Sequence, residues 1–75
     1  MKALVEYLIR SLSDHPEKAV VEESESEGTV RFRVVVADED KGKVIGKQGK
    51  VIKAVRALVA AAGAKSGRRT AVDVE

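Results

Sequence analysis

The residues best suited to chemistry lie in a short glycine-containing stretch, Ile45-Gly46-Lys47-Gln48-Gly49. Glycine has no Cβ, so a chain with two closely spaced glycines can turn sharply while its backbone touches a ligand. A helix that begins directly after Gly49 would have unpaired N–H groups and partial positive charge at its start, an arrangement that suits phosphate oxygens. The stretch therefore predicts an anion site built from main-chain groups.

Basic and apolar side chains flank this turn. Lys43, Lys47 and Lys50 are expected to add full charges beside the main-chain donors, and Lys53 shares a basic helix face with Lys50. Val44 and Ile45 arrive on the preceding turn of chain, and we expect them to form an apolar floor on which bases lie. The candidate nucleic-acid-binding residues are Lys43, Val44, Ile45, Gly46, Lys47, Gln48, Gly49, Lys50 and Lys53.

The pattern does not indicate a nucleotide hydrolase. A P-loop requires GxxxxGK followed by Ser or Thr. Here three residues separate Gly42 from Gly46, and Gln48 follows Lys47 where a magnesium-binding hydroxyl is needed. Both the spacing and the chemistry exclude that site.

Catalytic groups and metal ligands are not expected elsewhere either. Glu39 and Asp40 are explained as acids at the start of a helix, where the dipole favours negative charge. His15 is alone and precedes Pro16, which is typical of a turn residue. The chain has no cysteine, so it offers no thiolate site and fits a reducing compartment such as the cytoplasm. We expect no enzyme activity, no cofactor and no membrane segment.

Hydrophobic periodicity predicts the elements that position the turn. The expected elements are a helix from residue 3 to 13 or 14, a strand over 19–24, a polar turn over 24–28, a strand over 30–36, a short helix from 38, a helix over 49–62 ending at Gly63, and a strand over 70–74. This order, α-β-β-α-α-β, predicts an α+β fold in which three helices cover one face of a three-stranded sheet. One domain over residues 1–75 is expected, since a chain this short has room for one core.

The charge is segregated along the chain. Residues 1–28 hold three basic and seven acidic side chains, whereas residues 29–75 hold eleven basic and five acidic ones. Between residues 41 and 72 there are nine basic side chains and no acidic one. Such a patch is the electrostatic footprint of a protein that binds a polyanion. The only aromatic residues, Tyr7 and Phe32, fall in predicted core stripes, so stacking of bases on aromatic rings is not expected.

The stretch Ile45-Gly46-Lys47-Gln48-Gly49-Lys50-Val51-Ile52 resembles the IGxxGxxI signature of KH domains. The extra helix and strand at the N-terminus resemble the type II variant, and the chain as a whole is similar to the KhpA-like family of small bacterial KH proteins. The resemblance implies a groove for about four nucleotides of single-stranded RNA, with the glycine turn clamping phosphates. It also implies Val34 and Val36 as part of a facing wall.

KhpA-like proteins are associated with self-pairing and with a larger KH-containing partner, so the resemblance leaves a homodimer open. The implied role is that of a non-catalytic RNA-binding protein of low sequence specificity, acting as an RNA chaperone or post-transcriptional regulator. Two alternatives remain at this point: an adaptor that uses a KH scaffold to dock a protein, and a protein that binds single-stranded DNA.

Overall fold

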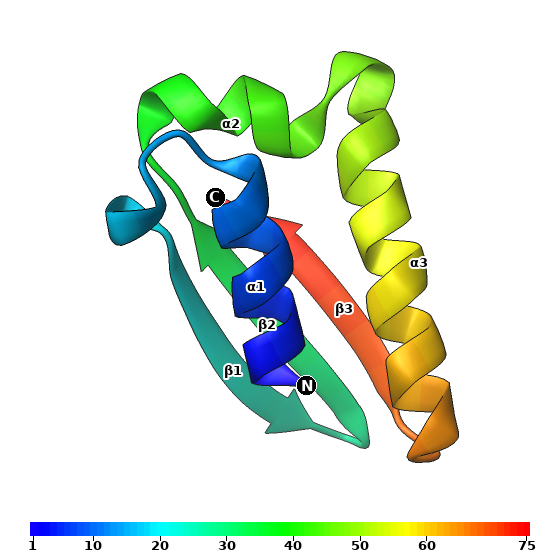
Figure 1. Cartoon of the computed structure of the whole chain (residues 1–75). Coiled ribbons are helices and arrows are strands. Elements are labelled where there is room, and N and C mark those ends of the chain that lie inside the picture. Colours follow the sequence, from blue (N-terminus) through cyan, green and yellow to red (C-terminus); the bar gives the residue numbers. More distant parts are fainter.

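The computed structural model describes all residues from 1 to 75 (Figure 1). Its elements are the helix α1 (Lys2–Leu12), the strands β1 (Val20–Ser26) and β2 (Thr29–Val35), the helices α2 (Asp38–Ile45) and α3 (Lys50–Lys65), and the strand β3 (Arg69–Val74). Single 3-10 turns lie at Pro16–Lys18 and Lys47–Gly49. The order of elements is the one that the sequence predicts.

The three strands form one sheet in the order β1-β2-β3. β1 and β2 are antiparallel, whereas β2 and β3 are parallel and are joined by a crossover through α2 and α3. Figure 1 shows all three helices on the same face of the sheet, with α3 beside β3. The predicted α+β fold is confirmed, and its topology is consistent with a type II KH domain.

Side chains from both layers form one hydrophobic cluster between the sheet and the helices. Its members are Val5, Ile9, Ala19, Val21, Val30, Phe32, Val34, Val36, Val44, Ile52, Val55, Val59 and Val72. Burial alternates along β2, as the period of two in its sequence requires. Phe32 is fully buried at the centre, so its predicted core position is confirmed.

Three expectations about buried and exposed side chains were wrong. Tyr7 is 70% exposed, because α1 turns Val5 and Ile9 toward the sheet and leaves Tyr7 on its outer side. Val34 and Val36 are core residues with 0% and 5% exposure, so they cannot form the wall of a groove.

The β1–β2 connection is tighter than the polar turn expected over residues 24–28. β1 extends to Ser26, which pairs with Thr29, so the loop contains only Glu27 and Gly28. Both have positive φ, +54° and +80°, as a type I′ hairpin turn requires. The local geometry of the turn thus allows the strands to pair over their full length.

Gly63 does not end α3, contrary to its expected role as a helix terminus. The helix continues to Lys65, and Gly63 is buried within it. A Cβ at Gly63 would lie 2.6 Å from Cγ2 of Thr70 and 3.0 Å from the carbonyl oxygen of Arg68. Glycine here permits the start of β3 to lie directly against the end of α3.

Candidate nucleic-acid interface

The glycine turn is the joint between α2 and α3. α2 ends at Ile45, and the amide of Gly46 donates to the carbonyl of Gly42 at 2.8 Å. The turn closes with the amide of Gly49 donating to the carbonyl of Gly46 at 3.1 Å, and α3 begins at Lys50. The chain therefore changes direction within the four residues from Gly46 to Gly49.

Both glycines are required, for different reasons. Gly46 has φ +77° and ψ 169°, a conformation that is essentially restricted to glycine. A Cβ on Gly46 would also lie 2.4 Å from Cγ2 of Val51, so there is no room for a side chain. Gly49 is left-handed at φ +75°, but an added Cβ would meet only Cγ2 of Ile52, at 3.9 Å. Gly46 is needed because Val51 of α3 lies directly against it, and Gly49 is needed for its left-handed backbone conformation.

The N-terminus of α3 is electrostatically unusual. Gly49 is its N-cap residue, so no side chain caps the first N–H groups, and no acidic residue lies in the first turn. Acidic residues there would stabilise the helix through its dipole, yet Lys50 and Lys53 occupy the start instead. This arrangement costs helix stability and concentrates positive potential at the turn, which suits a bound anion.

Three of the four candidate lysines are free to meet a ligand. Lys47, Lys50 and Lys53 are exposed, and none of them forms an ion pair. Lys43 instead donates a hydrogen bond to the carboxylate of Asp14, which raises the pKa of the Lys43 ammonium above its usual value. The structure thus separates Lys43 from the other three as a residue that joins α2 to the end of α1.

The two apolar candidates also differ. Ile45 is 39% exposed beside the glycine turn, whereas Val44 is fully buried in the core. Any apolar floor for bases at this end of the site consequently consists of Ile45. Val44 holds α2 against the sheet and offers no surface to a ligand.

A buried carboxylate fixes α2 from the other side. Asp40 has no exposed surface, and it accepts the amide of Asp14 at 3.1 Å and the amide of His15 at 2.9 Å. Burial by itself would raise the pKa of Asp40, but the hydrogen bonds from His15 and Asp14, with the nearby charges of His15 and Lys43, outweigh it and hold the pKa below its usual value. Asp40 therefore ties α2, and with it the glycine turn, to the segment after α1.

The sequence explains Asp40 only as an acid at a helix start, and it gives no signal of this contact. Asp40 and the two amides that it binds lie 26 and 25 residues apart in the chain. No local spacing connects them, so only the tertiary fold reveals the bond.

A pocket of about 290 Å³ lies between α3 and β3. It is lined by Arg56, Ala60, Thr70, Ala71, Val72 and Asp73. Nε of Arg56 crosses it to donate to the carbonyl of Val72 at 2.9 Å. Residues of β3, and not Val34 and Val36 as the resemblance implied, line this pocket opposite α3. None of these lining residues was among the sequence-based candidates.

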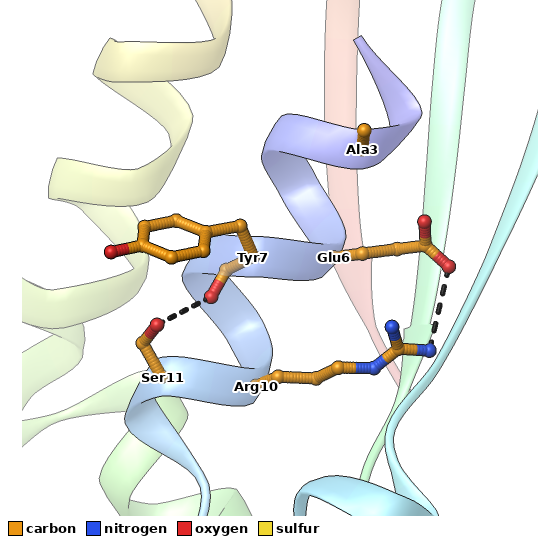
Figure 2. Close-up of a pocket in the computed structure, with 5 residues that line it drawn as sticks. All are labelled: Ala3, Glu6, Tyr7, Arg10 and Ser11. Atoms are coloured by element: carbon orange, nitrogen blue, oxygen red, sulfur yellow. Dashed lines mark hydrogen bonds and ion pairs between the residues drawn. The ribbon is translucent and has the colours of Figure 1, made fainter.

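A larger, shallow pocket of about 490 Å³ lies on α1 and includes none of the candidate residues. Figure 2 shows Glu6 and Arg10 pointing to one side of α1 and Tyr7 to the other. Its interactions are internal to the helix: the Ser11 hydroxyl donates to the Tyr7 carbonyl at 2.7 Å, and Arg10 pairs with Glu6 at 3.5 Å. The Ser11 hydroxyl and the side chains of Glu6 and Arg10 therefore have partners within the same helix.

No three His, Cys, Asp or Glu side chains lie together in a way that would hold a metal ion. None of the helices combines the length and the apolar character needed to span a membrane.

Comparison with known proteins identifies the family of the chain. The family described as KhpA/KhpB, KH domain, matches residues 2–74. The chain is 40% identical over 74 residues to "RNA-binding protein KhpA" of Oceanobacillus iheyensis, covering 99% of both chains, and 43% identical over 74 residues to the protein of that name from Clostridium perfringens, again covering 99% of both. The "RNA-binding protein KhpA" of Thermotoga maritima is 44% identical over 61 residues, which is 81% of each chain. No solved structure matches the chain. With its whole length matched and its glycine turn set between two helices, the chain belongs to the KhpA/KhpB family of KH domains.

Proposed function

We propose that this protein binds single-stranded RNA without catalysing a reaction, and that the Gly46–Gly49 turn grips the phosphate backbone. The observation that carries the proposal is the start of α3, where uncapped N–H groups, a left-handed Gly49 and unpaired lysines meet. Such a helix start favours a phosphate group. The name "RNA-binding protein" carried by the relatives supports RNA as the polyanion.

The nucleotide chain is proposed to run from the turn along α3. Lys47, Lys50 and Lys53 would contact phosphates, and Gln48 would present its backbone at the tip of the turn, where its φ of +58° holds it outward. The bases would then enter the pocket between α3 and β3. Because phosphate contacts carry no sequence information, most of the affinity would be independent of sequence.

Aromatic stacking has no part in this mechanism. Phe32 is fully buried, and Tyr7 lies on the outer side of α1 among residues of the α1 pocket. The site contains no aromatic platform of the kind on which bases stack in many single-strand-binding proteins. Affinity should therefore fall steeply as salt is added.

In the cell, this activity would act on short unpaired stretches of RNA in the cytoplasm, as an RNA chaperone or a post-transcriptional regulator. Single-stranded DNA is the competing ligand, because the turn contacts phosphate and not the 2′-hydroxyl. Competition between matched RNA and DNA oligonucleotides distinguishes the two.

A second candidate function, docking of a protein, is favoured by one specific observation. Leu58 on α3 is 55% exposed, while its neighbour Val59 is fully buried. Contact with a second copy of this chain or with a larger KH-containing protein would cover this side chain. Pairing through Leu58 is compatible with RNA binding, since Leu58 does not line the pocket between α3 and β3.

The experiment that separates the two functions is the substitution Gly49→Asp. The new side chain has room, and it places a negative charge where the phosphate is proposed to lie. Gly67→Asp is the matched control, because Gly67 has φ +70°, open surroundings and a position at the far end of α3. Loss of RNA binding in Gly49→Asp, with binding kept in Gly67→Asp, supports the proposal. Equal RNA binding by both variants contradicts it.

A further inference from the structure

The helix α2, which leads into the glycine turn, has little contact of its own with the core. Its only buried residues are Asp40 and Val44. By contrast, α3 buries four residues: Ile52, Val55, Val59 and Gly63. No side chain caps the start of α2, and a helix of eight residues is at best marginally stable by itself in water. The position of α2, and of the turn at its end, therefore depends on the few tertiary bonds that α2 makes.

Those bonds converge on Asp14 and His15, in the segment that follows α1. One carboxylate oxygen of Asp40 accepts the amide of Asp14 at 3.1 Å, and the other accepts the amide of His15 at 2.9 Å. Two more exposed contacts lie beside them: Nε2 of His15 is 3.3 Å from the carboxylate of Glu39, and Lys43 donates to the carboxylate of Asp14. Asp40 is the only member of this cluster that is fully buried, so its bonds are the ones with which water competes least.

We propose that Asp40 is a positioning residue for RNA binding: by holding α2 to the segment after α1, it keeps the Gly46–Gly49 turn in the conformation that receives a phosphate. The inference rests on the proposed RNA-binding function and assigns part of the affinity to a side chain that RNA cannot reach, since Asp40 has no exposed surface. When only a fraction of the molecules has a competent site, the apparent dissociation constant rises by the inverse of that fraction. Asp40 thus acts on affinity through the backbone of α2.

Asp40→Asn and Asp38→Asn form a matched pair of variants that separates positioning from charge. Both remove one negative charge from the first turn of α2. In Asp40→Asn the amide NH₂ replaces one of the two accepting oxygens, so one backbone N–H loses its partner. The side chain of Asp38 is 91% exposed and pairs only with Lys41 of the same helix. Charge alone predicts tighter RNA binding by both variants, because each becomes more positive. A positioning role predicts weaker binding by Asp40→Asn only.

The test measures the affinity for a labelled mixed-sequence oligoribonucleotide by fluorescence anisotropy, at a temperature at which circular dichroism shows every variant to be folded. Asp40→Asn is expected to bind about tenfold more weakly than the wild type, as a competent fraction of about one tenth implies. Asp38→Asn should bind at least as tightly as the wild type. Val5→Ala is the control for stability, because it removes core packing from α1 and leaves every bond of Asp40 in place. It should bind RNA as the wild type does.

Two results of this comparison overturn the inference while leaving the proposed function in place. One is that Asp40→Asn binds RNA as tightly as the wild type or as Asp38→Asn does. The other is that Val5→Ala loses as much affinity as Asp40→Asn, since the loss would then follow from lower stability alone. Absence of RNA binding by the wild type overturns the inference and the proposed function together.

Hydrogen exchange in the wild type tests the same coupling without a substitution, and it gives the answer if Asp40→Asn does not fold. If the bonds of Asp40 favour RNA binding, bound RNA must favour those bonds by the same factor. Saturation with the oligoribonucleotide is therefore expected to slow exchange of the Asp14 and His15 amides about tenfold. The Ser13 amide, which donates to Arg10 of α1, is the internal control and should slow less. Exchange at Asp14 and His15 that RNA leaves unchanged, or slows no more than at Ser13, overturns the inference.

Discussion

Gly46 and Val51 lie so close together that a Cβ on Gly46 would be 2.4 Å from Cγ2 of Val51. The end of α2 is thereby set directly against the first turn of α3, with no side chain between them. A side chain at position 46 would have to displace Val51 or its backbone. The absence of a Cβ at Gly46 therefore contributes to stability, and under the proposed function it would contribute to RNA binding as well.

Substitution of Gly46 by alanine is expected to lower the free energy of unfolding by about 1–3 kcal/mol, because it adds a clash and a strained backbone conformation. RNA binding should weaken as well. Gly42→Ala is the control: Gly42 lies within α2 with open space around it, so alanine there should stabilise the protein by about 0.5–1 kcal/mol. Urea unfolding measures the free energy of unfolding of both variants. An unchanged unfolding midpoint in Gly46→Ala would contradict the assigned contact.

The lysines around the turn should differ in their effect on salt dependence. If Lys47 contacts one phosphate, Lys47→Ala should reduce the slope of log K against log salt concentration by about 0.7, the value for one contact to a single strand. Lys50→Ala should do the same. Lys65, at the far end of α3, and Lys43, already bonded to Asp14, should leave the slope close to that of the wild type. If all four substitutions reduced the slope by the same amount, RNA would be held by a diffuse field of positive charge and not by a defined site.

Loss of the Asp40 carboxylate should destabilise the protein at neutral pH and change its response to acid. The folded-state pKa lies below the ordinary value of 3.8, so the carboxylate stabilises the fold above that value and loses its contribution as the pH falls through the folded-state pKa. The stability difference between wild type and Asp40→Asn should therefore be largest near neutral pH and narrow below pH of about 4.

Asp38→Asn is the control for this pH series. The side chain of Asp38 is 91% exposed, and its pairing with Lys41 at 3.4 Å is a surface contact. Asp38→Asn should follow the wild type at every pH. A difference between wild type and Asp40→Asn that is constant down to pH of about 2 would rule out the charge of Asp40 as the source of its contribution.

Gly63→Ala should destabilise the protein by about 1–3 kcal/mol, because the added methyl group meets Thr70 and the carbonyl of Arg68. Replacing Thr70 by serine removes Cγ2, the atom at 2.6 Å, so Gly63→Ala with Thr70→Ser should recover part of the loss. Thermal unfolding of the single and double variants measures the coupling. Strictly additive effects would contradict direct contact between positions 63 and 70.

Local patterns predicted the elements well. The alternation along Val30, Phe32 and Val34 corresponds to the buried face of β2, and the glycine turn falls between two helices as its flanking residues indicate. These features depend on residues that are neighbours in the sequence. For the same reason, the fold class and the resemblance to a KH family followed from the sequence alone.

Features that depend on tertiary contact were not predictable. Tyr7 and Val5 both fit an apolar stripe, and only the packing of α1 on the sheet decides which one is buried. The bond between Asp40 and the amides after α1, and the pairing of Lys43 with Asp14, join residues far apart in the chain. The wall of the pocket formed by β3 requires the strand order, which periodicity does not give.

The proposal that the Gly46–Gly49 turn grips RNA is tested most directly by NMR, in a titration of ¹⁵N-labelled protein with a mixed-sequence oligoribonucleotide. We expect saturable chemical-shift changes at the amides of Gly46 to Val51, with further changes along α3 and at residues 70–74 of β3. We expect no comparable changes at Arg31 and Arg33, which lie on the opposite face of the sheet in pairs with Asp73 and Glu75. Saturable binding that shifts those arginine amides and leaves positions 46–51 unchanged would contradict the proposal.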